Sequence, residues 1–162
     1  MKKINLLFLF SIFLILLSCK TETKNYTLQN IEFTVEGPLF EGSNSAQYEV
    51  EVDVNKIQSA DKINEAKFIS CQLFAPDSSD FSNVSGFVLQ LTGENSDMTE
   101  IALLNQVNGG SYVQLKPSSD KDISNFFKQN KFILLMDTYL KKDQEKNLKF
   151  KANIVFEVKV NQ

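Results

Sequence analysis

Residues 148–160, Leu-Lys-Phe-Lys-Ala-Asn-Ile-Val-Phe-Glu-Val-Lys-Val, decide the fold class of this chain. One alternating phase carries the apolar side chains of Leu148, Phe150, Ala152, Ile154, Phe156, Val158 and Val160. A period of two is typical of a strand with one buried face, whereas a helix would spread these side chains around its circumference. Full burial of the six large ones contributes about 10–18 kcal/mol as an upper bound. We therefore predict a core strand at the C-terminus.

The same alternation recurs upstream. Residues 48–54 place Tyr and three Val on one face and three acids on the other. Further strands are expected at 31–35, 68–74, 87–92, 100–104, 112–116 and 132–139, separated by turn sequences such as Gly37-Pro38, Thr92-Gly93-Glu94-Asn95 and the hairpin signal Asn108-Gly109.

One segment follows a helical spacing instead. Capping residues at 118–122 precede Ile123, Phe126 and Phe127, which predicts a short helix of about two turns whose aromatic pair covers an open end of the sheets. The whole pattern predicts an all-β fold. We expect one domain at 26–162, an immunoglobulin-like or jelly-roll-like β-sandwich of about eight strands with one short helix; a closed barrel is the alternative.

The N-terminus has the three parts of an export signal. Met1-Lys2-Lys3 is basic, residues 4–17 are apolar except for Asn5 and Ser11, and the stretch closes with Leu16-Leu17-Ser18-Cys19. Its apolar run is shorter than the roughly 18–20 residues that cross a bilayer, which disfavours an uncleaved membrane anchor. The closing residues resemble the lipobox of bacterial lipoproteins, which implies a signal peptide at 1–18 and a lipid-modified Cys19; secretion with full release is the other alternative.

Lipidation at Cys19 sets the expected location. Residues 19–25 would be the lipidated Cys and a short polar tether reaching about 20 Å when extended, with several fatty chains giving permanent attachment. We expect a cell-envelope protein anchored at the outer membrane. Some lipoproteins carry clustered acids after the Cys that direct them to the cell surface, but here Glu22 stands between Lys20 and Lys24, so the periplasmic and surface faces both stay open.

Composition excludes several functions. Loss of Lys2 and Lys3 with the signal takes the net charge from −3 to −5, and the chain has no Arg, which argues against nucleic-acid partners. With no His, neither a Ser-His-Asp nor a Cys-His nucleophile arrangement is possible, and a structural zinc site lacks ligands. We therefore predict no enzyme activity, no metal and no cofactor. Cys71 is expected as a buried core residue, with a reactive or intermolecular thiol as the alternative.

The remaining polar candidates are carboxylates. Glu49, Glu51 and Asp53 share a strand face, and we interpret them as a solvated surface that pairs across strands with lysines such as Lys149, Lys151 and Lys159; a calcium or acid–base surface is the alternative. The acids in two loop segments can supply oxygen ligands, yet helix capping and turn formation explain them more simply. These segments are Asp77–Asp80 and Asp120–Asp122.

A sugar-binding surface would need exposed aromatic side chains, and Trp is absent. The candidates outside the clearest core positions are Phe40, Phe81, Tyr112 and Tyr139. We expect these side chains to fill the edges of the core.

The order of features from about Ile57 resembles β-sandwich lipoproteins of Bacteroidetes-type bacteria. The segments that carry this resemblance, over roughly two-thirds of the chain, are Ser59–Ile63, Phe81–Val84, Phe87–Leu89, Ala102–Asn105, Asp122–Lys128 and Phe132–Leu135. The resemblance implies the same fold and compartment, and it implies no catalytic residues.

These observations predict a non-catalytic protein-binding or scaffolding module with a protein partner in the envelope. An immunity lipoprotein, which neutralises an incoming toxin, is a special case of this prediction. A glycan-binding surface lipoprotein is the alternative, followed by an enzyme that acts on envelope glycans through carboxylates.

Overall fold

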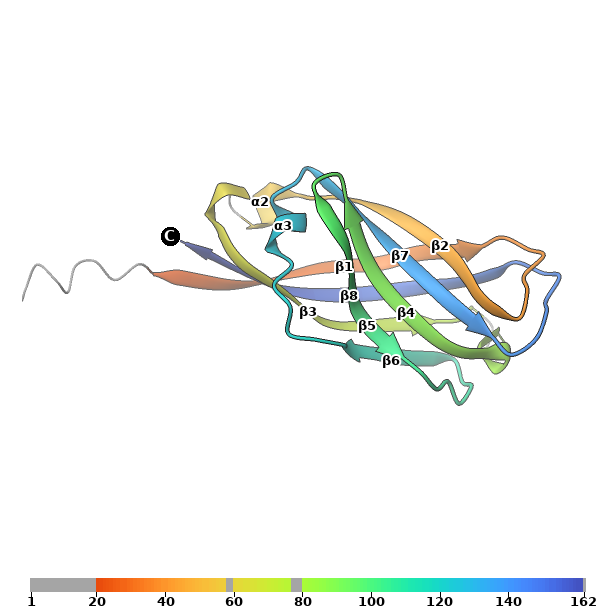
Figure 1. The fold of residues 1–162 in the computed structure, drawn as a ribbon. Coiled ribbons are helices and arrows are strands. Elements are labelled where there is room, and N and C mark those ends of the chain that lie inside the picture. The colour runs from red at the N-terminus through yellow and green to blue at the C-terminus, as the bar shows by residue number, and fades with distance from the viewer. Residues whose placement is uncertain (1–19, 58–59, 77–79, 162) are drawn as a thin grey trace, which may run out of the picture.

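The computed structural model describes residues 20–57, 60–76 and 80–161 (Figure 1). The predicted signal peptide and Cys19 lie outside the described residues. No helix within the described ranges is long and apolar enough to span a bilayer.

Eight strands account for most of the described chain, and helix is confined to short connecting turns. The strands are β1 (Thr21–Val35), β2 (Gly42–Glu51), β3 (Ile63–Phe74), β4 (Val84–Gly93), β5 (Ser96–Leu104), β6 (Tyr112–Pro117), β7 (Lys131–Leu140) and β8 (Leu148–Asn161). The helical turns are α2 (Val54–Ile57), α3 (Ser124–Phe127) and the 3₁₀ turns η1 (Ala60–Lys62) and η2 (Asp80–Asn83). The all-β prediction is confirmed.

The strands form one antiparallel sheet, in the order β1-β8-β3-β6-β5-β4-β7-β2, folded into two facing layers (Figure 1). One layer is β1-β8-β3-β6 and the other is β5-β4-β7-β2. Only two residue pairs, Ala102–Pro117 and Leu103–Lys116, join the layers between β5 and β6. This order defines an eight-stranded jelly roll. Among the described strands β1 and β2 end the sheet and are not paired with each other, so the sheet is open rather than a closed barrel.

Aromatic side chains from both layers fill the space between them. Phe150 and Phe156 of β8 carry the predicted apolar phase and are 1% and 0% exposed. The Phe150 ring lies 5.6 Å from Phe87 of β4, and the Phe156 ring lies 6.4 Å from Phe132 of β7. Each such edge-on contact adds about 0.5–1.5 kcal/mol beyond area burial. The stretch that predicted the fold therefore supplies the centre of the core.

The structure differs from the predicted tether at residues 21–25. These residues are the start of β1 and pair with β8, from Thr21 opposite Asn161 to Asn25 opposite Glu157. Both faces of the strand carry polar side chains here, so the sequence contains no apolar alternation that would predict it. Backbone hydrogen bonds to β8 stabilise this part of the strand instead. We call the end of the molecule that carries Thr21 and Asn161 the proximal end, and the opposite end, with the 36–41 and 141–147 connections, the distal end (Figure 1).

The predicted strand 48–54 is too long by three residues. β2 ends at Glu51, and the chain turns into α2 at Val54. Tyr26 explains the turn, because its hydroxyl donates to the Glu51 carbonyl at 3.3 Å and accepts the Asp53 amide at 3.2 Å. The side chain of Tyr26 thereby bridges the unpaired edges of β1 and β2.

Asn108-Gly109 lies in the longer connection 105–111 rather than in a tight hairpin turn, although the strands on either side, β5 and β6, are antiparallel neighbours. Residues 105–111 carry the chain from β5 in one layer to β6, most of which pairs with β3 in the other layer. Gly109 and Gly110 both adopt positive φ, 79° and 101°, which side chains other than glycine rarely tolerate. The glycines do allow the chain to turn, as the sequence indicates, but the turn carries the chain from one layer to the other.

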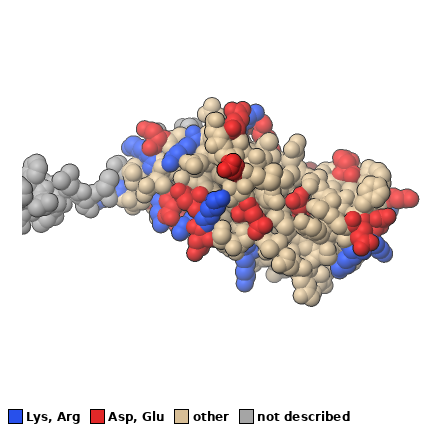
Figure 2. Space-filling model, in the orientation of Figure 1, with Lys and Arg blue, Asp and Glu red and all other residues tan. Residues whose placement is uncertain are grey.

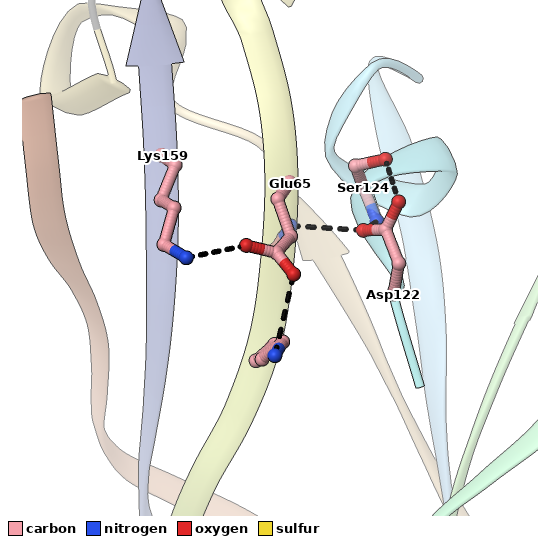
Figure 3. Close-up of polar contacts among 6 residues, drawn as sticks. Glu65, Asp122, Ser124 and Lys159 are labelled. Atoms are coloured by element: carbon pink, nitrogen blue, oxygen red, sulfur yellow. Dashed lines mark hydrogen bonds and ion pairs between the residues drawn. The ribbon is translucent and has the colours of Figure 1, made fainter. Parts of the chain in front are cut away.

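The predicted helix exists, at α3, with one turn instead of two. Asp122 ends the extended segment before it: its Oδ1 accepts the amides of Ala66 on β3 at 3.0 Å and of Ser124 at 2.9 Å (Figure 3). Burial raises the pKa of the Asp122 carboxyl, but these amides, the Ser124 hydroxyl and the charge of Lys128 together hold it below the usual value. Phe126 and Phe127 are 3% and 0% exposed, which confirms that they close the proximal end.

Candidate binding face

The outer face of the β5-β4-β7-β2 layer carries apolar side chains that the core does not use. In β7 the inward phase is Phe132, Leu134, Met136, Thr138 and Leu140, and the outward phase is Lys131, Ile133, Leu135, Asp137 and Tyr139. Three of these five outward side chains are large and apolar or aromatic. A strand that is apolar on both faces is typical of one covered on both, yet no element of the described chain packs over this face.

Strand register assembles these side chains into one surface. Asp137 lies opposite Val88 on one side and Ser45 on the other, and Val88 lies opposite Leu103. The neighbouring rows bring Tyr139 beside Gly86 and Leu135 beside Gln90. We call this surface the outer patch; it comprises Val88, Gln90, Leu103, Leu135, Asp137 and Tyr139.

An open depression of about 360 Å³ indents the patch toward the distal end. Its lining includes Gly86, Val88, Leu103 and Tyr139. Leu103 and Tyr139 are 38% and 39% exposed, whereas Val88, at 7%, is covered by its neighbours although it points away from the core cluster. Gly86 permits the close approach of β5, because a Cβ there would lie 2.7 Å from the Leu104 carbonyl oxygen.

Asp137 is the only acid of the outer patch, and it is held in place by neutral donors. The Ser45 hydroxyl donates to Oδ1, and Gln90 Nε2 lies 3.5 Å from Oδ2. Within the described chain no lysine approaches this carboxylate within 4 Å. Gln90 Oε1 is buried and accepts no hydrogen bond from the described residues. The acceptor with unmet hydrogen-bonding capacity at the surface of the patch is therefore the Asp137 carboxylate.

The three acids predicted on one strand face do not converge. Glu49 forms a 3.0 Å salt bridge with Lys131, which raises the pKa of the Lys131 ammonium through the hydrogen bond and the charge of Glu49. Glu51 is exposed, and Asp53, beyond the end of β2, lies 4.0 Å from Lys56. The prediction that these acids pair with lysines across strands is confirmed for Glu49. The lysine belongs to β7 and not to β8, because β2 lies beside β7.

The lysines proposed as partners belong to β8, in the other layer. Lys151 pairs with Glu32 at 3.3 Å. Lys159 pairs with Glu65 at 2.6 Å, as Figure 3 shows. Lys159 and Lys67 hydrogen-bond to Glu65 and lower the pKa of its carboxyl. These exposed pairs contribute little each.

The loop acids have structural positions where the structure describes them. Asp122, just before α3, accepts the amides of Ala66 and Ser124, and Asp120 is exposed. Asp77 and the side chain of Asp80 lie outside the described residues. Among the described residues, no group of three or more His, Cys, Asp or Glu side chains is arranged to hold a metal ion.

The four aromatic candidates have different surroundings. Phe81 is fully buried against Phe87, as expected for a core residue. The prediction is wrong for the exposed side chains Phe40 and Tyr112, and Tyr139 belongs to the outer patch. Tyr112 stacks on Phe74 across β6 and β3, with ring centroids 6.3 Å apart.

Cys71 is fully buried in β3, which confirms its predicted core position. Burial strongly raises the pKa of its thiol, because the thiolate would be desolvated. The thiol is therefore protonated and shielded.

Comparisons with known proteins place the fold. No protein-family model matches the sequence, and no curated protein matches it. The structure is similar to that of infectious bursal disease virus, Gx strain, with a TM-score of 0.51 and 14% identity over 88% of this chain. The chain spans about a third of the length of that viral protein, 34%.

Weaker likenesses include the T13 particle of the same virus, with a TM-score of 0.44, 15% identity and coverage of 89% of this chain and 32% of the other. Another is CpGH89CBM32-5 from Clostridium perfringens in complex with GalNAc-β-1,3-galactose, with a TM-score of 0.39, 11% identity and coverage of 82% and 94%. Of the three, only the first exceeds a TM-score of 0.5, and it supports the jelly-roll fold alone.

Proposed function

We propose that this chain is a lipid-anchored, non-catalytic binding module of the bacterial cell envelope that holds a protein partner on its outer patch. The observation that carries the proposal is the outward phase of β7, where Ile133, Leu135 and Tyr139 lie at the surface, together with exposed Leu103 of β5. The inner face of the same sheet already packs into the aromatic core. Half-exposed apolar and aromatic side chains around a depression are typical of interaction surfaces. Figure 2 shows uncharged surface interrupted by separate acidic groups over the middle of the face in view, with lysines mainly toward the two ends.

The proposed anchor and the patch are compatible in position. β1 begins at Thr21, two residues after the proposed lipid at Cys19, so the proximal end would lie against the bilayer. The depression is near the start of β4 and the end of β7, in the distal half of the molecule. A partner would therefore reach it from the side that faces away from the membrane.

Affinity purification tests the proposed function. The tagged full-length chain would be recovered from detergent-solubilised envelopes and compared with L103E and with Q114E, a matched control on the exposed face of β6. We expect one stoichiometric protein with the native chain and with Q114E, and at least about tenfold less with L103E. No stoichiometric protein, or equal recovery with both variants, would contradict the proposal. For the immunity-type case, the partner would be a toxin encoded beside this gene.

The proposed lipid has its own test. Mass spectrometry of the mature chain should show a start at Cys19 carrying a diacylglycerol and, usually, an amide-linked acyl chain. The C19A variant should lose this mass and should retain the uncleaved segment 1–18. An unmodified mature start at another residue would contradict the anchor.

Glycan binding is the second candidate function, and the exposed Phe74–Tyr112 stack favours it. The flat faces of aromatic rings pack against the apolar faces of sugar rings. Glycan-array binding that is lost with Y112A but retained with L103E would support this function, and an array on which the native chain binds nothing would contradict it.

A further inference from the structure

We infer that the partner of the outer patch presents a Lys or Arg side chain to Asp137, set among apolar side chains that pack on Leu103 and Tyr139. The inference rests on the proposed function and specifies the chemistry of the partner. Its basis is a carboxylate that lies between apolar side chains of β4 and β7 on one side and polar Ser45 of β2 on the other, without a cation beside it.

The position of Asp137 is set by the sheet. It is the outward residue of β7 between Leu135 and Tyr139, and Val88 flanks it on β4. The Ser45 hydroxyl and Gln90 Nε2 orient the carboxylate, but both are neutral and leave its charge uncompensated. A carboxylate accepts about four hydrogen bonds, so capacity remains for a charged donor.

The lysines that flank the patch along β7 are engaged elsewhere. Lys131, six residues away and so about 20 Å along the strand, is paired with Glu49. Lys141, beyond the other end of β7, donates to the Ser82 carbonyl at 3.0 Å. No other lysine of the described chain forms an ion pair with Asp137 either, so a partner can supply the cation.

Charge complementarity selects the occupant. In a two-fold contact between copies of this chain the same patch meets itself, which would bring the two Asp137 carboxylates together. An anionic lipid surface would likewise be repelled. A protein that offers Lys or Arg satisfies Asp137, and its neighbouring apolar side chains exclude water from the pair, which strengthens it.

Panning of a phage-displayed random peptide library on the full-length chain in detergent micelles tests this chemistry. The targets are the native chain, D137N, D137K, L103E and a charge control, D97K, at an exposed acid near the start of β5. We expect the native chain and D97K to enrich peptides with a Lys or Arg beside aromatic or aliphatic residues. These peptides should bind D137N at least about tenfold more weakly, and D137K should select Asp or Glu at the same position.

The failure of this inference can be told apart from the failure of the proposed function. Peptides that lose binding with L103E but bind the native chain and D137N equally would overturn the inference and leave the docking surface intact. No enrichment over empty micelles, or peptides insensitive to L103E, would overturn both. Circular dichroism and the unfolding midpoint of each variant show whether it is folded, and D137N, nearly the same shape as the native residue, is the decisive variant if D137K fails to fold.

Discussion

Asp122 shows how much local structure one side chain can organise. Its carboxyl ties the amide of Ala66 in β3 to the first turn of α3, and so holds the closing aromatic pair over the proximal end. Sequence indicated a cap in this segment because Ser and Asp precede the helical spacing. It could not indicate the bond to β3, which joins residues 56 positions apart.

The D122A variant should lower the free energy of unfolding by about 1–3 kcal/mol at pH 7, because hydrogen bonds to a charged acceptor are lost. The pKa of Asp122 in the folded chain lies below that in the unfolded chain, about 3.9. The ionised carboxyl therefore stabilises the fold above that pH, and the stabilisation is lost as the pH falls through the folded pKa.

Urea unfolding at several pH values checks this expectation. The difference between the native chain and D122A should be constant from pH 6 to 8 and should shrink below about pH 4. D120A, at an exposed neighbour, should change stability by less than about 0.5 kcal/mol. A difference that grows in acid would contradict the assignment.

Cys71 should be the one titratable thiol of the mature chain, because the proposed lipidation consumes the thiol of Cys19. Its burial and raised pKa predict no reaction with a thiol reagent under native conditions. In denaturant we expect one thiol per chain. Rapid labelling of the native protein would contradict the buried position, and two thiols in denaturant would contradict the lipid.

At the scale of elements, β1 is where sequence reasoning was least complete. Its apolar part, 31–35, was predicted, whereas Thr21–Asn25 was not, because both faces of that segment are solvated and its stability comes from pairing with β8. Amide hydrogen exchange should therefore show protected amides within 21–25. Exchange at the rate of an unstructured peptide throughout this segment would contradict its pairing with β8 and would support the predicted tether.

The close approach of β4 and β5 beneath the outer patch requires glycine at position 86. A Cβ at this position would meet the backbone oxygen of Leu104 at 2.7 Å, and a backbone atom cannot move aside as a flexible side chain can. We expect G86A to destabilise the fold by about 1–3 kcal/mol through overpacking. S43A, at an exposed position of β2, is the control and should change stability by less than about 0.5 kcal/mol. An unchanged unfolding midpoint for G86A would contradict the close approach of β4 and β5.

The positions of the strands could be predicted from the sequence, but the pairing between strands could not. All eight strands have an apolar phase such as Phe150–Phe156, which a period of two reveals. Pairing depends on which buried faces fit together, so Glu49 could be predicted to face solvent but not to meet Lys131. The sequence predicted either an immunoglobulin-like or a jelly-roll-like sandwich, and the strand order in the structure shows the jelly roll.

The outer patch was missed for a related reason. The sequence marks Tyr139 as a candidate, and it predicts strands through Val88 and Leu103 without indicating which face each side chain occupies. The signal was present in β7, where Ile133, Leu135 and Tyr139 make the outward phase apolar as well. The same pattern also fits a strand that is buried on both faces. Only the order of strands in the two layers shows that no described element covers the outer face of β7.

The whole molecule combines three features: a proximal end beside the proposed lipid, an open two-layer core, and an outer patch that includes Asp137. Photo-crosslinking in living cells tests their connection most directly, with a photo-reactive phenylalanine analogue in place of Leu103 or, as control, of Gln114. We predict one discrete protein adduct from position 103, abolished by D137K and absent from position 114. No adduct from position 103, or the same adduct from both positions, would contradict the claim that this face holds a protein partner.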